Sequence, residues 1–419
     1  MVLRKPLLRI PFTDVLPAPH ILPRHATTPA AAVAALGAFL TAPPPPGLPQ
    51  ATVAITGAGL SVASGLADYR GANGTYRVNK TYRAIYHHEF IASHEARKRY
   101  WARSFLGWST LRKAAPNAAH YAVRDLGRLG YLHAVVTQNV DSFHRLAHSQ
   151  RPATVELHGY LRATVCTSCF REFSRDAFQD DLARLNPVWA AFLVEAIASG
   201  ALQPDKAEQA DSSHSSRSSR VFRSIRSNPD GDVDVPGAPY TTFRYPACPH
   251  CLAQPPMAKD GSRQAVEVGN DGAWMPPRSG GRGAGILKPA VVMFGENIAP
   301  AVKHAAEAAV DQAGRLLVLA TSLATYSAWR LAKRARDRGM PIAIVNMGGV
   351  RGEEAFFDSV GLDQDGSQGV RVEMSTDSLL PMLVDELQRT ARKNSPAASE
   401  DDGRGADCSD PALFRDMLS

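Results

Sequence analysis

The chain has 419 residues, enough for two to four domains of ordinary size. Its 44% hydrophobic and 21% charged residues are typical of a globular protein and exclude a disordered or collagen-like chain. The net charge of +7 is spread over a long chain and does not by itself indicate nucleic-acid binding. No run of 18 apolar residues occurs, so the sequence predicts no membrane span.

The N-terminal 28 residues carry four basic side chains against one acid, Asp14. Basic, acid-poor N-termini are typical of mitochondrial transit peptides. Five prolines interrupt any amphipathic helix here, so a disordered tail is the alternative interpretation. We therefore expect a transit or disordered segment over 1–28 and a mitochondrial matrix location, with the nucleus or cytoplasm as the alternative.

A helix and several buried strands are predicted next along the chain. Thr28, Pro29 and an alanine-rich run predict a helix that begins at Pro29, has Thr28 as its N-cap and ends at the prolines of 43–46. Compact apolar runs predict strands at 51–56, 133–138, 315–322 and 341–347. Because these runs lack polar alternation, they indicate parallel strands buried on both faces, with crossover helices such as 323–340 between them. The sequence therefore predicts an α/β fold.

Two stretches, 202–239 and 253–285, are poor in large apolar side chains. The first contains SSHSSRSSR and the second contains MPPRSGGRGAG. We expect both to be disordered inserts, and the chain from 393 onward to be a disordered tail. A phosphorylated or nucleic-acid-contacting arm is the alternative interpretation of the Ser/Arg run.

Gly57-Ala58-Gly59 follows the first predicted strand and precedes a predicted helix. Glycines at such a turn let a phosphate approach the backbone, and the helix N-terminus adds amide donors and a positive dipole. The spacing differs from G-x-G-x-x-G, so a tight turn without a ligand is the alternative.

Four of the five cysteines form two C-x-x-C pairs, Cys166 with Cys169 and Cys248 with Cys251. Two such pairs supply the four thiolates of a closed, structural zinc site. Two disulfides or reduced core cysteines are the alternatives. Cys408 lies in the polar tail and is not expected to take part.

Polar residues follow the predicted strand at 133–138, in the segment TQNVDSFH. Gln138, Asn139 and Asp141 would project from the carboxyl end of that strand, where open α/β sheets bind ligands. His158 lies further on, in ELHG, just before the first cysteine pair. Its place between these two motifs favours a general base, and a structural histidine is the alternative.

Taken together, these motifs resemble the sirtuin family. GAGLSVASGLADYRG resembles the family's GAGxSxxSGIPDFRG, TQNVDSFH resembles TQNxDxLH, and ELHG resembles xxHG. The cysteine pairs, LKPAVVMFGE, ATSLATYSA and IVNMGG match the remaining blocks in order, over roughly residues 30–390. RYWARSFLGW (99–108) and the segment 157–189 resemble the class II branch, whose best-known member is mitochondrial sirtuin-4.

The resemblance implies a Rossmann-like parallel-sheet domain, a smaller zinc-binding domain, NAD as a consumed co-substrate and one structural Zn²⁺. It places these residues at the pyrophosphate: Gly57, Ala58, Gly59 and Ser61. It places these in a mobile cofactor loop: Asp68, Tyr69 and Arg70. It places these at the nicotinamide and its ribose: Gln138, Asn139, Asp141 and His158. It places these on the adenosine side: Thr321, Ser322, Asn346 and Met347.

The same resemblance implies the catalytic set His158, Asn139 and Asp141. His158 would take a proton from a ribose hydroxyl as a neutral imidazole, so activity should fall below its pKa, ordinarily about 6.5. The acyl-lysine peptide would enter between the two domains as an added strand, with LKPAVVMFGE (287–296) as a wall of the cleft. Tyr100, Trp101 and Arg103 are candidates for shaping the acyl pocket.

Three residues depart from the family pattern: Ala67 stands for Pro, Tyr69 for Phe and Ala320 for Gly. Tyr69 resembles Phe in shape. The methyl group of Ala320 lies near the implied cofactor, and we expect it to weaken binding modestly.

We expect the sheet domain to comprise 29–160 and 286–392, and the zinc module to comprise 161–285. The predicted reaction removes acyl groups from protein lysine and yields nicotinamide, O-acyl-ADP-ribose and deacylated lysine. A mono-ADP-ribosyltransferase on the same scaffold is the first alternative. A zinc-containing chromatin or nucleic-acid-binding module that uses the Ser/Arg insert is the second. The expected partners are acyl-lysine proteins, without a membrane or direct nucleic-acid contact, and a monomer is compatible with the sequence.

Overall fold

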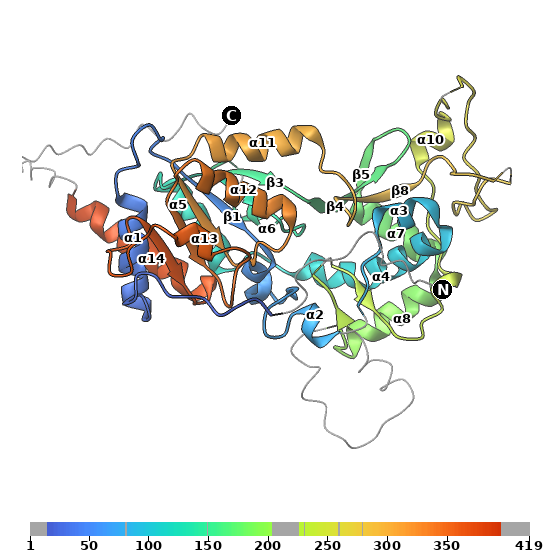
Figure 1. Cartoon of the computed structure of the whole chain (residues 1–419). Coiled ribbons are helices and arrows are strands. Elements are labelled where there is room, and N and C mark those ends of the chain that lie inside the picture. The colour runs from blue at the N-terminus through green and yellow to red at the C-terminus, as the bar shows by residue number, and fades with distance from the viewer. Residues whose placement is uncertain are drawn as a thin grey trace, which may run out of the picture.

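The computed structural model describes residues 15–79, 82–148, 150–202, 226–229, 231–258, 260–278 and 280–394. Its central element is a six-stranded parallel sheet with the order β11-β10-β9-β1-β2-β3 (Figure 1). The strands are β1 (Thr52–Thr56), β2 (Leu132–Thr137), β3 (Ala153–Glu156), β9 (Arg315–Leu319), β10 (Ile342–Val345) and β11 (Gly369–Val372). The four predicted strands are β1, β2, β9 and β10, which confirms the α/β fold. The edge strands β3 and β11 were not predicted, because each has only four residues and includes a charged side chain.

Helices cover both faces of the sheet, because successive strand residues point to opposite sides. On one face, Ala54 packs under the helices α1 (Pro29–Thr41), α5 (Ala118–Arg128) and α14 (Thr376–Asn394). On the other face, Val53 and Ile55 pack under α11 (Pro300–Asp311), α12 (Tyr326–Asp337) and the short α13 (Glu354–Phe357). The predicted crossover helix over 323–340 is thus confirmed as α12, and its polar face is exposed.

The described part of the segment before α1, from residue 15 onward, contacts the sheet domain. Leu22 pairs with Arg371 at the edge of the sheet, and its side chain is buried. Thr28 accepts a hydrogen bond from Ala31 N, as expected of the predicted N-cap. Residues 1–14 lie outside the described residues.

A second hydrophobic core lies in the right-hand half of Figure 1 and combines three stretches of sequence. Its helices are α3 (His87–Ala92), α4 (His94–Lys113), α7 (Arg175–Leu185), α8 (Pro187–Ala198) and α10 (Pro249–Ala253). Its sheet is antiparallel and contains β4 (Gly159–Cys166), β5 (Glu172–Ser174) and β8 (Leu287–Val291). The expected module boundaries of 161–285 are therefore too narrow. The aromatic side chains of α3 and α4, predicted in the sheet domain, belong to this second core instead. Phe90 of α3 packs on Trp101 of α4, whose ring packs on Phe178 of α7.

The two stretches expected to be disordered are ordered wherever the structure describes them. Trp274 is 2% exposed, its indole N–H donates to Ala284 O, and its ring stacks on Tyr245. The buried indole thus anchors 253–285, a segment with few large apolar side chains. In the other stretch, β6 (Arg226–Ser227) and β7 (Val233–Asp234) form a hairpin, followed by the 3-10 helix η3 (Tyr240–Thr242). The Ser/Arg run at 212–220 and the tail after 394 lie outside the described residues.

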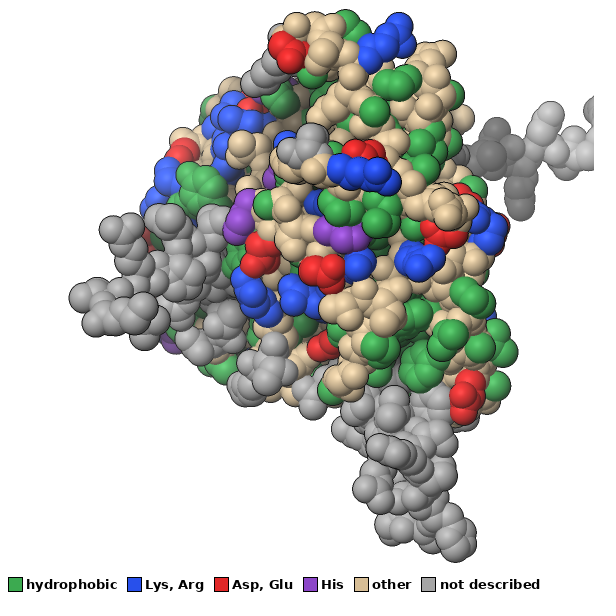
Figure 2. Space-filling model, turned by 90° about the vertical axis from the view of Figure 1, so that its right-hand side faces the viewer, with side chains coloured by type: hydrophobic (Ala, Val, Ile, Leu, Met, Phe, Trp, Pro, Cys, Tyr) green, Lys and Arg blue, Asp and Glu red, His purple; other side chains and the backbone are tan. Residues whose placement is uncertain are grey.

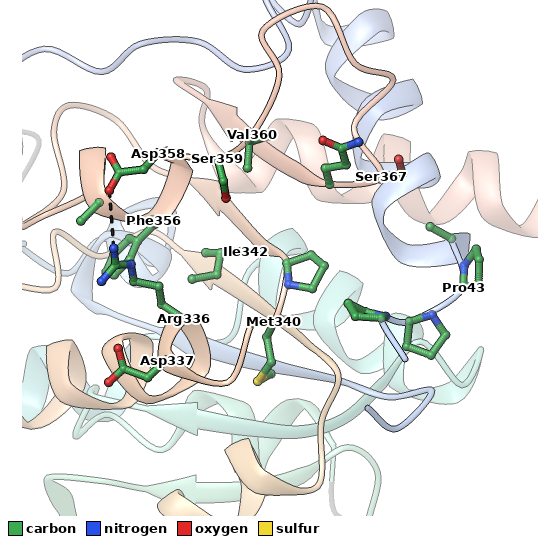
Figure 3. A pocket seen from close by; sticks show the side chains of 17 residues that line it. Pro43, Arg336, Asp337, Met340, Ile342, Phe356, Asp358, Ser359, Val360 and Ser367 are labelled. Atoms are coloured by element: carbon green, nitrogen blue, oxygen red, sulfur yellow. Dashed lines mark hydrogen bonds and ion pairs between the residues drawn. The ribbon is translucent and has the colours of Figure 1, made fainter. Parts of the chain in front are cut away.

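A surface pocket of about 670 Å³ lies at the amino-terminal side of the sheet, far from the strand ends where a ligand was expected (Figure 3). The proline run from Pro43, the end of α12 and the loop after α13 form its walls, with Arg336 and Asp358 paired across it. On the module face shown in Figure 2, basic side chains lie among acidic and apolar ones. Within the described part of the chain, no helix has the length and apolar character needed to cross a membrane.

Candidate functional site

The predicted ligand-binding residues meet at the carboxyl edge of the parallel sheet. Gln138 directly follows β2, and Thr321 lies two residues after β9. Because these strands flank β1, the side-chain amide of Gln138 reaches across it and donates to Thr321 Oγ1 at 2.8 Å. The backbone N–H of Gln138 donates to Thr56 O at 3.0 Å. Asn346 follows β10 at the same edge, but its side-chain amide donates to the carbonyls of its own loop.

The glycine turn after β1 leads into the predicted helix, which is the 3-10 helix η1 (Ala58–Ser64). A Cβ atom on Gly57 would lie 2.5 Å from Thr321 Cβ, and one on Gly59 would lie 3.0 Å from Ala320 O. Both glycines are therefore required by the close packing of this turn against the loop after β9. Ala320 adopts a positive φ of 50°, a conformation that favours glycine. This is the position at which the family resemblance expects Gly.

Ser61, Asn139 and Asp141 form one hydrogen-bonded group beside this turn. Ser61 Oγ donates to Asp141 Oδ2 at 2.7 Å, and Asn139 Nδ2 donates to Ser61 Oγ at 3.1 Å. Burial raises the pKa of Asp141, although hydrogen bonds from Phe143 N and Ser61 favour its carboxylate. The structure thus brings together three residues that the sequence places in two separate motifs.

His158 is held by hydrogen bonds at both ring nitrogens. Nδ1 lies 3.1 Å from Gln138 O, and Nε2 lies 2.8 Å from Ser327 Oγ. A carbonyl oxygen can only accept, so Nδ1 carries the proton of the neutral ring and Nε2 offers its lone pair. Burial lowers the pKa of His158 to about 4, and the Gln138 carbonyl offsets part of this shift. Burial therefore favours the neutral ring, so we expect His158 to act as a base at lower pH than an ordinary histidine.

The predicted cofactor loop is folded on itself. Asp68 Oδ1 accepts from Gly71 N at 3.0 Å, and burial raises the pKa of Asp68. Tyr69 stacks on Tyr76 with ring centroids 5.5 Å apart, and the guanidinium of Arg70 lies 5.0 Å from the centroid of the same ring. Tyr69 and Arg70 are thus packed within the loop.

The remaining predicted site residues differ in their surroundings. Ser322 O accepts from Arg351 N at 2.9 Å, whereas Met347 is 61% exposed. Tyr100 and Trp101 are buried in the second core, with their rings in an edge-on contact. They are therefore core side chains of the module. Arg103 is also buried and is paired with Asp232.

The four predicted zinc ligands converge at one end of the module. All four sulfur atoms lie within 4.8 Å of one another, and three of these cysteines are buried. Cys166 Sγ lies 3.6 Å from Cys251 Sγ, and Cys169 Sγ lies 3.7 Å from Cys248 Sγ. Tetrahedral coordination with Zn–S bonds of about 2.3 Å requires sulfur separations of about 3.8 Å. The donor set fits a structural zinc ion, and all four thiols are unoxidised.

Two site residues were missed by sequence reasoning. Thr325 Oγ1 donates to Gln138 Oε1 at 2.9 Å, and Ser327 contacts His158. Thr325 is the N-cap of α12 and Ser327 lies in its first turn, after the loop that follows the carboxyl end of β9. Their position in the ATSLATYSA block was the available signal, although spacing alone does not show which hydroxyl faces His158.

Comparison with known proteins shows the family to which the chain is similar. The model of the Sir2 family matches residues 57–327. The NAD-dependent protein deacylase SIR4 of Batrachochytrium dendrobatidis is 37% identical over 329 residues, which cover 78% of this chain and 89% of that protein. The mitochondrial NAD-dependent protein lipoamidase sirtuin-4 of Bos taurus is 32% identical, with 73% and 77% of the two chains covered. A solved chain from work on the mechanism and regulation of Sir2 enzymes has a TM-score of 0.48 at 22% identity and covers 85% of this chain and 98% of that one.

The chain belongs to the Sir2 family, the sirtuins. The curated relatives extend this match beyond the bounds of the family model, to most of the described part of the chain.

Proposed function

We propose that this sirtuin removes acyl groups from the lysine side chains of proteins, with NAD as its consumed co-substrate. The observation that carries the proposal is the neutral His158, whose Nδ1 is fixed by Gln138 O and whose Nε2 keeps its lone pair. Asn139 and Asp141, just after Gln138 in the chain, are hydrogen-bonded to Ser61 of the turn after β1. Deacylases among the relatives support the same reaction class. Bound NAD would supply the electrophilic ribose carbon that receives the acyl oxygen.

Different residues at the carboxyl edge of the sheet would bind different parts of NAD. Gly57, Gly59 and Ser61 would bind the pyrophosphate at the turn after β1. Gln138 and Asn139 would orient the nicotinamide ribose. His158 would accept a proton from a ribose hydroxyl on Nε2, because Nδ1 is already committed to Gln138 O. Thr321 and Asn346 lie further along the same sheet edge, where the adenosine would bind.

The acyl-lysine segment would bind between the sheet domain and the module. The backbone N–H of Val292, just after β8, donates to His158 O at 2.8 Å. The strand that would form the wall of the cleft is therefore tied directly to the catalytic segment. A substrate backbone added beside it would bring its acyl-lysine toward His158.

Nicotinamide release against a panel of acyl-lysine peptides tests this function. We expect the wild type to release nicotinamide and form deacylated peptide, and His158→Ala to lose most deacylation. His304→Ala, on the exposed side of α11, is the matched control and should keep wild-type turnover. No release from any peptide would overturn the proposal. Radiolabel transferred from NAD onto protein, without O-acyl-ADP-ribose, would instead establish the mono-ADP-ribosyltransferase alternative.

We also propose a mitochondrial matrix location, with cleavage of a presequence before Leu22. The basic N-terminus and the mitochondrial bovine relative support this proposal. Leu22 is buried at the sheet edge, so a cut beyond it would remove a packed residue. N-terminal sequencing of protein recovered from mitochondria tests both points. An intact Met1 in the cytoplasm or nucleus would overturn them.

A further inference from the structure

Ser327 lies beside the proton-accepting nitrogen of His158. Its Oγ is 2.8 Å from Nε2, and Nε2 carries the lone pair because Nδ1 donates to Gln138 O. The hydroxyl of Ser327 is therefore the donor in this contact. Ser327 therefore donates to the same lone pair that would accept the proton of a ribose hydroxyl.

The beginning of α12 holds His158 through two linked contacts. Ser327 contacts the ring directly, and Thr325 Oγ1 donates to the side chain of Gln138 at 2.9 Å. Gln138 in turn accepts from the ring through its backbone carbonyl. The imidazole ring, Gln138 and the beginning of α12 thus form a closed network, in which the side chain that contacts Nε2 is that of Ser327.

We propose that Ser327 is a positioning residue for His158, an inference that rests on the proposed deacylation. When His158 accepts the ribose proton, the hydroxyl O–H bond breaks and an Nε2–H bond forms. Rotation about its Cβ–Oγ bond lets Ser327 first yield the Nε2 lone pair to the ribose hydroxyl and then accept from the new N–H. The same hydroxyl thus holds the ring in both protonation states and neither gains nor loses a proton. Such pre-organisation shortens the search for the reactive geometry.

Kinetics that separate the two halves of the reaction test this role. Exchange of labelled nicotinamide into NAD reports the half before His158 acts, and deacylated peptide reports the whole. Ser327→Ala should lower deacylation about tenfold, as expected for one hydrogen bond to a ring that becomes charged. Nicotinamide exchange and the KM for NAD should stay within about twofold, because only the later proton transfer needs the ring in place.

Control variants distinguish positioning from damage to the fold. Ser327→Thr keeps a hydroxyl and should restore most of the lost rate. Ser378→Ala removes an exposed hydroxyl that donates to Ser375 O at the beginning of α14, and it should leave both rates unchanged. Added to His158→Ala, Ser327→Ala should cause no further loss, because it acts through that ring. The proposal would be overturned if Ser327→Ala kept wild-type deacylation or lost exchange and deacylation equally. An additive loss in the double variant would also overturn it.

A measurement without substrate keeps the two proposals separable. The nitrogen-15 resonance of His158 Nε2 should move in Ser327→Ala and stay in place in Ser378→Ala. An identical Nε2 resonance in wild type and Ser327→Ala would overturn the positioning role even in an active enzyme. A shifted resonance in a chain that releases no nicotinamide would instead show the contact to be present and overturn the proposed function, and the positioning role in catalysis with it.

Discussion

The guanidinium of Arg103 lies 2.8 Å from the carboxylate of Asp232, and the two side chains are only 5% and 8% exposed. Arg103 belongs to α4 and Asp232 to the β6–β7 hairpin, so the pair joins the helical part of the module to the segment after the Ser/Arg run. Burial is the largest single influence on the pKa of Arg103 and lowers it. Asp232, with smaller contributions from Tyr82, Asp234 and Tyr240, reverses this effect, so the pKa of Arg103 is raised overall.

Breaking this pair should strongly destabilise the module. Asp232→Ala leaves a buried cation without its partner and should lower the free energy of unfolding by about 3–5 kcal/mol. Replacement of both, Arg103→Met with Asp232→Leu, should recover most of that loss. Asp181→Ala removes an exposed ion pair with Arg184 and should cost less than about 1 kcal/mol. Urea denaturation measures all three, and equal effects of Asp232→Ala and Asp181→Ala would contradict the prediction.

Deacylation should persist at pH values where an ordinary histidine would be protonated. With the pKa of His158 lowered to about 4, the base remains neutral at pH 5.5. The kcat/KM for the acyl peptide, which follows the protonation of the free enzyme, should therefore fall less than twofold between pH 7.5 and about 5.5. A base with a pKa of about 6.5 would lose about tenfold over the same range. A tenfold loss, in protein that stays folded at pH 5.5, would show that burial does not control this group.

Acid should destabilise the fold through its buried histidines. Burial lowers the pKa of His120 to about 4, so between pH 6.5 and 4 the unfolded chain binds a proton that the folded chain does not. The contribution of His120 to the free energy of unfolding is thus constant above pH 6.5. Below that pH it falls by about 1.4 kcal/mol per pH unit. Burial also lowers the pKa of nearby His144. His120→Gln should flatten the pH dependence of urea unfolding, and exposed His304→Gln should leave its slope unchanged.

Loss of one thiolate should release zinc and unfold the module. Cys251 is fully buried beside Cys166, so Cys251→Ser removes one of four ligands from a closed site. We expect about one equivalent of zinc in wild type and little in the variant, with a lower thermal midpoint. Cys408→Ser, outside the described residues, should retain the metal. Metal analysis and thermal unfolding decide this, and zinc retained by Cys251→Ser would exclude the site.

Ala320→Gly should stabilise the loop after β9. Ala320 has a φ of 50°, which costs an alanine about 1 kcal/mol that glycine does not incur. The same change in the middle of α12, Ala332→Gly, should destabilise by about 1 kcal/mol, because helical backbone favours alanine. Opposite signs in urea unfolding would confirm the strain at Ala320. A lower KM for NAD in Ala320→Gly would also support the expected proximity of the Ala320 methyl group to the cofactor.

Local patterns predicted much of this protein because they span only a few residues. The apolar runs of β1, β2, β9 and β10 indicate buried parallel strands, since both faces of each are covered. Edge strands β3 and β11 escaped prediction because their short sequences contain charged side chains. The predicted boundaries of the module differ from the structure for another reason. The aromatic residues of α4 show that they are buried, but not against which core.

The length of 419 residues is compatible with two to four domains. The described residues form a parallel-sheet domain and a module assembled from separate stretches. Residue type and short-range spacing determined the family, the cysteine ligands and the candidate base His158. Only the tertiary structure decided the tautomer and pKa of His158, its contact with Ser327 and the partner of Arg103. Those properties depend on distances between residues far apart in the chain. Such distances are set by how the crossover helices and the two cores pack, and no local pattern encodes them.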